Sequence, residues 1–143
     1  MKTVNIYLEN GGKSPKPCAG WYGYILEYQG QRLYTRKRFA RVEGTRQERD
    51  LVMLLDAMER CKPCRIRVYT EESYLAGGYE RLPHYVNKKW ITARGDPVKH
   101  KNLWKRILEQ SAEKPLEFIL GPHGYTEWLR TEIERRKKSD TAG

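Results

Sequence analysis

Long apolar runs are missing from the sequence. No stretch approaches the roughly 20 apolar residues that a membrane helix requires, and the start, MKTVNIYLEN, lacks the apolar core of a signal peptide. We therefore expect a soluble protein of the cytoplasm, with no membrane contact. Repeats and interdomain linkers are missing too, and 143 residues suffice for one hydrophobic core but not for two. The sequence predicts a single domain over residues 1–138, followed by a flexible tail over 139–143.

Cysteine is scarce and odd in number. The three cysteines are Cys18, Cys61 and Cys64, which argues against a disulfide framework in a cytosolic chain. Cys61 and Cys64 have a metal-like spacing, but a zinc site needs four ligands and the chain has no second pair. The pair also follows a predicted helix, whereas redox pairs lie at helix starts, where the dipole lowers a thiol pKa. We expect ordinary, partly buried thiols.

Acidic residues are the scarcer charge. The chain has 28 Lys and Arg against 18 Asp and Glu, a formal net charge of +10. Such an excess predicts attraction to polyanions, either nucleic acid or an anionic membrane. Residues 81–106 contain eight of the basic residues and one acid, Asp96, so about seven units of the excess lie in this segment.

Aromatic residues are interleaved with this basic segment, at Tyr85, Trp90 and Trp104. Lysine and arginine can contact phosphates, and aromatic rings can pack or stack along a nucleic-acid strand. The alternative is a solvated face around a packing core of tryptophans. We expect these residues to have different roles: Trp104 packs in the core, Trp90 supports the structure, and Lys88 and Lys89 contact the ligand.

Hydrophobic periodicity predicts the order strand, strand, strand, helix, strand, helices, strand, helix. We expect strands at about 4–9, 20–28, 32–39, 65–70 and 116–120, and helices at about 45–61, 72–77, 102–112 and 126–136. A tight turn at Gln29-Gly30 joins the second and third strands as a hairpin. A hairpin followed by strand-helix-strand crossovers gives a mixed sheet flanked by helices, so the predicted fold class is α/β.

Four glutamates occupy positions where acids are locally unusual. Glu9 follows the first strand and Glu71 the fourth, and ligands of α/β sheets gather at the carboxyl ends of strands. Helical spacing places Glu48 and Glu132 on the apolar stripes of their helices. Inward carboxylates that converge repel one another, and divalent metal is the usual compensation. Taken singly, each could instead be a solvated helix residue or a charge at a helix N-terminus.

The order of these elements and acids resembles type 1 ribonuclease H, over about Thr3 to Arg136. That family carries four carboxylates: an Asp on the first strand, a Glu on the first helix, an Asp ending the fourth strand, and an Asp near the last helix. The matching residues here are Glu9 in Leu-Glu-Asn-Gly, Glu48 in Thr-Arg-Gln-Glu, Glu71 in Tyr-Thr-Glu-Glu-Ser-Tyr, and Glu132 in Leu-Arg-Thr-Glu. Asn87-Lys-Lys-Trp90 looks like part of its basic protrusion, at about 81–101. The resemblance implies a ribonuclease H-like fold with a five-stranded mixed sheet, in which a three-strand antiparallel region continues into parallel strands.

The resemblance also implies a divalent-metal-dependent endonuclease that hydrolyses the RNA strand of RNA–DNA hybrids. The four glutamates would hold two ions, Mg²⁺ or Mn²⁺; one would activate a water, and the other would stabilise the departing oxygen. His123 lies within one residue of the family's mobile histidine and would assist proton transfer or product release; a loop histidine without a role is the alternative.

The all-glutamate set departs from the family, because three of its four positions carry Asp there. Each Glu extends the carboxylate by one methylene, about 1–1.5 Å. Either the backbone has retreated to suit, or the metal pair is distorted and catalysis is weak, with Mg²⁺ more affected than Mn²⁺. A catalytically weak or inactive module that binds hybrid or duplex is therefore the alternative function, and a basic protein-interaction domain is a third.

The residues that the resemblance assigns to nucleic-acid contact come from the first helix and the protrusion. They are Arg46, Tyr85, Asn87, Lys88, Lys89, Trp90, Lys99 and Lys101. The asparagine-rich readers of the RNA 2′-hydroxyl are poorly kept, since the chain has Gly44-Thr45-Arg46 and Pro17-Cys18 at those places. We expect nucleic-acid binding by a monomer. The resemblance implies hybrid as the ligand, whereas the poorly kept readers argue against strict selectivity for hybrid over other duplexes.

Overall fold

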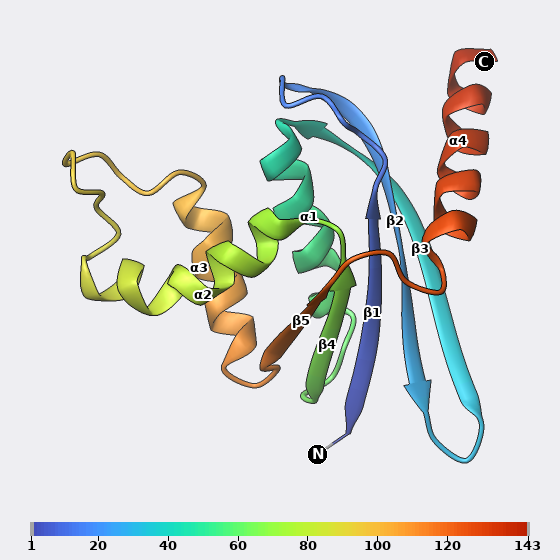
Figure 1. Ribbon diagram of the computed structural model, residues 1–143, viewed down its shortest axis with the longest axis horizontal. Helices are drawn as coiled ribbons and strands as arrows, with labels where there is room; N and C mark the ends of the chain where they lie inside the picture. Colours follow the sequence, from blue (N-terminus) through green and yellow to red (C-terminus); the bar gives the residue numbers. More distant parts are fainter. Residues whose placement is uncertain (1, 143) are drawn as a thin grey trace.

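Within residues 2–142, which the computed structural model describes, five strands form one mixed sheet with helices on both faces (Figure 1). The strands are β1 (Thr3–Asn10), β2 (Cys18–Gln29), β3 (Leu33–Gly44), β4 (Arg65–Thr70) and β5 (Leu116–Leu120). The helices are α1 (Arg46–Glu59), α2 (Ser73–Asn87), α3 (Lys101–Ser111) and α4 (Thr126–Ala142). The order β3-β2-β1-β4-β5 is antiparallel from β3 to β1 and parallel from β1 to β5. The predicted α/β class and five-stranded mixed sheet are confirmed.

The parallel pairing of β1 with β4 determines which residues meet at one edge of the sheet. Tyr7 pairs with Tyr69, so the same register places Glu9 next to Glu71 two residues later. Successive side chains of a strand point to opposite faces. Glu9 therefore faces α4, whereas Asn10 faces α1, and the strand ends present polar groups to both sides of the sheet.

The main core lies between the sheet and α1, with α2 and α3 on the far side of α1 (Figure 1). A capping box starts α1: the Thr45 hydroxyl accepts from the Glu48 N–H, and the Glu48 carboxylate accepts from the Thr45 N–H. Fully buried members of this core include Ile6, Leu8, Leu51, Leu54, Met58, Ile66, Val68 and Trp104. The packing fixes α1 against the carboxyl ends of β1 and β4.

The opposite face of the sheet is covered by α4, which packs on β1 and β2. Its buried side chains Leu129 and Ile133 settle close to the strands because glycines leave room there. A Cβ on Gly11 would lie 2.5 Å from Ile133 Cγ2, and one on Gly23 would lie 3.5 Å from Leu129 Cδ2. These close approaches bring the second turn of α4 over the end of β1.

The helix α2 is longer than the predicted segment 72–77. It continues to Asn87, through two glycines and Pro83, because Leu82 is buried and the Trp104 ring packs directly against Gly78. A Cβ on Gly78 would lie 2.1 Å from Trp104 Cζ2. Tertiary packing thus outweighs residues that by themselves favour an earlier end of the helix.

The helix α4 is also longer than predicted, and the segment expected to be a flexible tail is helical up to residue 142; residue 143 lies outside the described part. Asp140 anchors the last turns, because Trp21 Nε1 donates to its Oδ2 at 2.5 Å. Arg41 Nε lies 4.0 Å from the same carboxylate. Both partners come from neighbouring strands, which sequence periodicity alone does not reveal.

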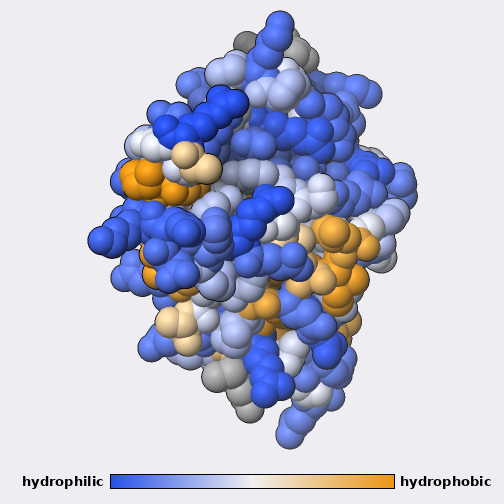
Figure 2. Space-filling view, turned by 60° about the vertical axis from the view of Figure 1, so that its left-hand side comes forward, coloured by the Kyte–Doolittle hydropathy of each residue, from blue (hydrophilic) through white to orange (hydrophobic). Residues whose placement is uncertain are grey.

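The face of the molecule seen in Figure 2 is mostly hydrophilic, with separate apolar patches. Exposed large apolar residues include Val86 at the end of α2 and Ile91 in the loop after it. Within residues 2–142, none of the helices combines the length and the apolar character needed to cross a membrane.

Candidate active site

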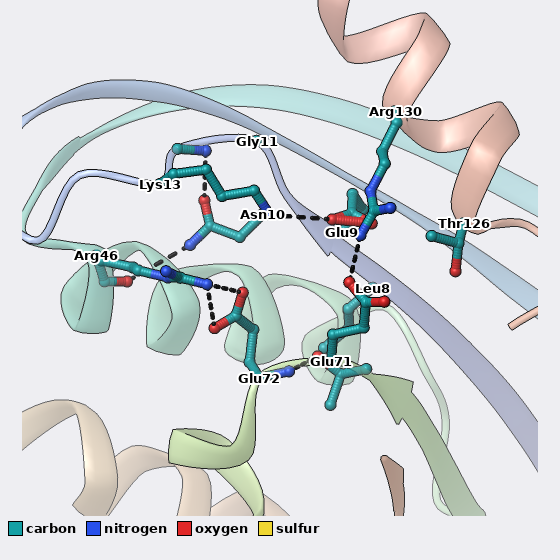
Figure 3. Close-up of polar contacts among 12 residues, drawn as sticks. Leu8, Glu9, Asn10, Gly11, Lys13, Arg46, Glu71, Glu72, Thr126 and Arg130 are labelled. Atoms are coloured by element: carbon teal, nitrogen blue, oxygen red, sulfur yellow. Dashed lines mark hydrogen bonds and ion pairs between the residues drawn. The ribbon is translucent and has the colours of Figure 1, made fainter. Parts of the chain in front are cut away.

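Two carboxylates meet on the α4 side of the sheet edge and share one arginine (Figure 3). Glu9 is only 5% exposed, and its Oε2 lies 3.3 Å from Nε of Arg130. Nη2 of Arg130 is hydrogen-bonded to Glu71, so the guanidinium bridges the two acids. Lys13 approaches Glu9 from solvent at 3.9 Å. Burial raises the pKa of Glu9 while Arg130 and Lys13 oppose the rise, so this carboxylate depends on its cations to stay ionised.

A second polar cluster lies on the α1 side of the same edge. Asn10 Nδ2 donates to Asp50 Oδ1 at 2.7 Å, and Arg46 Nη2 donates to both Glu72 oxygens at 2.9 and 3.1 Å. The other Asp50 oxygen, Oδ2, is buried and has no hydrogen-bond partner among the described residues. Burial, aided by the charge of Glu72 and opposed by the Asn10 hydrogen bond, raises the pKa of Asp50 to about 7. The positive charge of Arg46 opposes this rise but does not outweigh burial.

A groove of about 420 Å³ opens onto this second cluster. Its lining consists of Pro15, Thr45, Arg46, Gln47, Asp50, Glu71, Glu72, Ser73, Tyr74 and Lys99. Acids from the end of β4 and from α1 thus face basic residues of α1 and of the loop before α3. Such a groove can admit an anionic ligand along its basic wall and bring it to carboxylates at its floor.

The structure does not bring all four predicted glutamates together. Glu9 and Glu71 meet through Arg130, but Glu48 serves the start of α1 instead. The Glu48 carboxylate accepts from the Thr45 N–H at 3.0 Å, and this bond lowers the Glu48 pKa. The expectation that Glu48 joins the acidic cluster is corrected accordingly: as the third residue of α1, it is occupied by the capping box.

Glu132 is likewise outside the cluster. Its carboxylate accepts from Arg135 one turn further along α4, at 2.8 Å, and the buried stripe of the helix is formed by Leu129 and Ile133. The α4 side chain that reaches the strand-end acids is Arg130, a base where the prediction placed an acid. The predicted role of Glu132 is therefore not supported by its position.

Asp50 and Glu72 are the acids that sequence reasoning missed. Asp50 lies four and eight residues before Leu54 and Met58, so helical spacing could have placed it on the buried stripe. Glu72 lies four residues after Val68, and strand alternation directs both to the α1 face. The resemblance pointed instead to Glu48, two residues before Asp50, and to Glu71, one residue before Glu72.

His123 is near the cluster but is held in place. Its Nε2 lies 3.3 Å from the Leu8 carbonyl, and its Nδ1 accepts from the Tyr125 N–H at 3.2 Å, which makes Nε2 the protonated nitrogen. The ring also packs against Tyr7 and Tyr69. Burial lowers the His123 pKa, so this side chain is a neutral clamp between the loop and β1.

The basic protrusion folds back on itself between α2 and α3. Trp90 is buried and packs on Tyr85, with ring centroids 5.8 Å apart, and the Val98 N–H donates to the Trp90 carbonyl at 2.9 Å. Left-handed backbone at Lys89 and Trp90 makes the turn. Trp104 lies in the core, as predicted, and Trp90 has the predicted supporting position.

The other predicted contact residues differ in exposure. Asn87, Lys88 and Lys89 are exposed at the end of α2, Lys101 is half-buried, and Lys99 is exposed at the rim of the groove. The four exposed side chains can meet a ligand, whereas Tyr85 and Trp90 pack on each other.

The cysteines are free thiols, as expected. Burial raises the pKa of Cys61 to about 11, and it raises the pKa of Cys64 as well. Thiols with raised pKa values are poor nucleophiles and poor metal ligands at neutral pH.

Comparison with known proteins agrees with this fold. A family model described as RNase H matches residues 1–126. A protein of Shewanella halifaxensis named ribonuclease H is 30% identical over 98% of this chain and 88% of its own length. A ribonuclease H of Gluconobacter oxydans is 36% identical over 80% of this chain and 74% of its own length.

Solved structures with the same architecture have little sequence identity with this chain. The crystal structure of LC9-RNase H1, described as a type 1 RNase H with the type 2 active-site motif, matches with a TM-score of 0.74 at 15% identity, over 97% of this chain and 74% of that one. A foamy viral protease-reverse transcriptase in complex with RNA/DNA hybrid matches with a TM-score of 0.68 at 14% identity, over 92% of this chain and 19% of that one. Fold and sequence agree: the chain has the ribonuclease H-like fold and belongs to the ribonuclease H family of nucleases.

Proposed function

We propose that the protein hydrolyses the RNA strand of RNA–DNA hybrids with the help of divalent metal, bound in the groove between β4 and α1. The observation that carries this proposal is that Asp50 and Glu72 line one groove at the carboxyl end of β4, where the buried Oδ2 of Asp50 has no partner among the described residues. The family supplies the reaction type, and a foamy viral neighbour in complex with RNA/DNA hybrid supports the substrate.

The residues beside Asp50 fit one divalent ion. The buried Oδ2 of Asp50 has no partner among the described residues and burial raises the pKa of Asp50, so this oxygen lacks a cation, while the neighbouring Glu72 carboxylate is paired with Arg46. Among residues 2–142, no three acidic, histidine or cysteine side chains are arranged around one point. Mg²⁺ is nevertheless commonly held by one or two carboxylates, waters and substrate phosphates, and Mn²⁺ accepts the same oxygen ligands.

In this proposal the protein's own side chains divide the work. Asp50 and Glu72 hold the ion, which supplies a Lewis acid and an acidified water when bound. Asn10 orients Asp50 by its hydrogen bond, and Arg46 orients Glu72 by its two. Lys99 binds a phosphate at the rim of the groove, and Lys88, Lys89 and Lys101 extend this basic surface along the protrusion.

The test is cleavage of a labelled RNA–DNA hybrid in Mg²⁺ and in Mn²⁺. Asp50→Asn and Glu72→Gln should abolish cleavage, because each removes a carboxylate that faces the groove. Glu48→Gln and Glu132→Gln are matched controls that should keep it, since both side chains lie outside the cluster. No cleavage by the unaltered protein with either ion would refute the proposal.

A second candidate function is binding of hybrid or duplex without cleavage. The observation that favours it is Arg130, which already neutralises Glu9 and Glu71. Fluorescence anisotropy with hybrid should then give salt-sensitive binding that is the same with chelator and with Mn²⁺, and that is unchanged in Asp50→Asn. A metal-dependent gain in affinity would count against this alternative. A monomeric state and a cytoplasmic location stay predictions from the sequence.

A further inference from the structure

Arg130 has an unusual position for a surface arginine. Its guanidinium contacts three carboxylates at once: Glu9 at 3.3 Å, Glu127 at 3.8 Å, and Glu71 through a short hydrogen bond. Glu127 lies on the same helix and is almost fully exposed, so this contact is weak. The contacts with Glu9 and Glu71 join α4 to the ends of β1 and β4 (Figure 3).

The Glu9 carboxylate needs a cation at this place. It is 95% buried with Glu71 beside it, and a buried carboxylate without compensation strongly disfavours the folded state. Lys13, the other cation within reach, is 61% exposed and lies 3.9 Å away. Arg130 is therefore the principal counter-ion of this pair, and it is built into the chain.

A guanidinium and a divalent ion cannot share the space between Glu9 and Glu71. The two cations repel each other at such short range, and Arg130 already contacts Oε2 of each carboxylate. By contrast, the Asp50 side of the edge keeps a buried oxygen without a partner. Arg46 pairs with Glu72 on that side, so the two halves differ in that only the Asp50 half keeps a buried carboxylate oxygen without a partner among the described residues.

We propose that Arg130 determines how many ions the site takes: it fills the cation position between Glu9 and Glu71, so divalent metal binds there only when Arg130 is removed. The inference rests on the proposed function in one respect, that the Asp50–Glu72 half accepts an ion. Arg130 is here a positioning and specificity residue, because it keeps two carboxylates paired with the protein rather than with metal.

The test compares Arg130→Gln with Arg135→Gln in thermal unfolding and isothermal titration with Mn²⁺. Arg135 is the matched control, because it pairs with Glu132 on the same helix at 2.8 Å, outside the cluster. In chelator, Arg130→Gln should unfold at a lower temperature than the unaltered protein; saturating Mn²⁺ should reverse that loss, and titration should show one additional ion per chain. Arg135→Gln should match the unaltered protein in both measurements. An Arg130→Gln protein with the same metal stoichiometry and thermal shift as the unaltered chain would overturn the inference.

A second variant decides the matter even if Arg130→Gln does not fold. Glu9→Gln in the unaltered background should leave Mn²⁺ binding unchanged within twofold, because Arg130 and not metal occupies that carboxylate. Loss of Mn²⁺ binding in Glu9→Gln would overturn the inference. Because both readouts are binding, they are independent of hybrid cleavage: a protein that cleaves nothing but gains an ion in Arg130→Gln would refute the proposed function and support this inference.

Discussion

At the scale of single residues, Arg49 organises the loop that leads away from the site. It is fully buried, and its guanidinium donates to the carbonyl oxygens of Ser14 and Gly44. Gly12 and Gly20 lie against it so closely that a Cβ on either would approach the guanidinium group to 2.6 and 3.1 Å. One side chain of α1 therefore ties the segment after β1 to the end of β3, and among residues 2–142 it has no carboxylate partner within hydrogen-bond reach.

Arg49→Met should lower the free energy of unfolding by about 2 kcal/mol, because the carbonyl groups of Ser14 and Gly44 would lose the donor that the buried guanidinium supplies. Urea unfolding followed by circular dichroism measures the change. Lys62→Ala, at an exposed position after α1, is the control and should stay within about 0.5 kcal/mol of the unaltered protein. An Arg49→Met protein as stable as this control would contradict the assignment.

At the scale of single residues, the sequence predicted part of the site and missed the rest. Strand periodicity and the resemblance placed Glu9 and Glu71 correctly at one edge. Glu48 was misplaced because its spacing from Leu51 and Leu55 matches the apolar stripe, while its position next to Thr45 commits it to the capping box. The arginine on α4 could not be predicted, because its role depends on how the helix lies across the sheet.

At the scale of elements, Asp56 joins α1 to the two antiparallel strands beside it. Tyr22 of β2 donates to its carboxylate at 2.6 Å, and Arg38 of β3 donates at 3.0 Å. Arg60 adds a third hydrogen bond at 3.2 Å. Burial alone would raise the pKa of Asp56, but these three donors outweigh it, and the pKa is lowered.

An Asp carboxyl group whose pKa is lower in the folded than in the unfolded protein stabilises the fold. This stability is fully present above the unfolded pKa, near 3.9, and is lost as the pH falls through the folded pKa. Asp56→Asn should therefore cost about 1–2 kcal/mol at neutral pH, and the difference from the unaltered protein should shrink below about pH 4. Urea unfolding at a series of pH values checks this. A difference that is constant down to about pH 3 would show that the charge of Asp56 is not what stabilises the contact.

The pair Gly77 and Gly78 tests why α2 runs past the point where its sequence suggested an end. Gly78→Ala should destabilise the protein by about 1–3 kcal/mol, since its Cβ would overlap the Trp104 ring. Gly77→Ala should instead stabilise by about 0.5–1 kcal/mol, because there the new methyl meets only the flexible end of Arg81, 3.7 Å away. Thermal unfolding of the two variants gives the comparison. Equal effects of the two substitutions would argue against the close packing of α2 on α3.

The contrast between Gly77 and Gly78 also explains why the length of α2 could not be predicted from the sequence. The five strands and the first helix carry their own periodic signal. Their predicted bounds agree with the structure to within about two residues, except that β3 continues to Gly44, beyond the predicted end at about residue 39. The second helix contains Gly77, Gly78 and Pro83, which lower its intrinsic propensity, and its length is set by contacts with α3. Local pattern cannot supply a contact with a segment that follows more than 20 residues later.

At the scale of the whole molecule, positive charge is distributed unevenly. About seven of the ten net positive charges lie in 81–106, beside the groove that leads to the acids. Arg65 begins β4, at the opposite end of the strand from Glu71, and Lys62 lies in the connection before it. The two ends of the sheet therefore offer separate basic positions. If hybrid lies along the protrusion, only one of these ends should matter for binding.

The double substitution Lys88→Ala and Lys89→Ala should weaken hybrid binding and reduce the slope of log affinity against log salt by about two. The matched control is Lys62→Ala with Arg65→Ala, which removes the same charge from the far edge. Anisotropy titrations over a range of salt concentrations give both slopes. A control with the same loss would mean that net charge, rather than the protrusion, drives binding.

The outermost strand has a consequence for handling the protein. β3 is 12 residues long and pairs with β2 on one side only, so its other side offers a row of backbone groups to another molecule. Exposed Arg36, Lys37, Arg38 and Arg41 lie along it, and two copies approaching side by side would bring these cations together. Repulsion should keep concentrated solutions clear of fibre-like aggregates. A polyanion in excess would neutralise that repulsion, so the ligand that this surface attracts is also the agent that can make the protein precipitate.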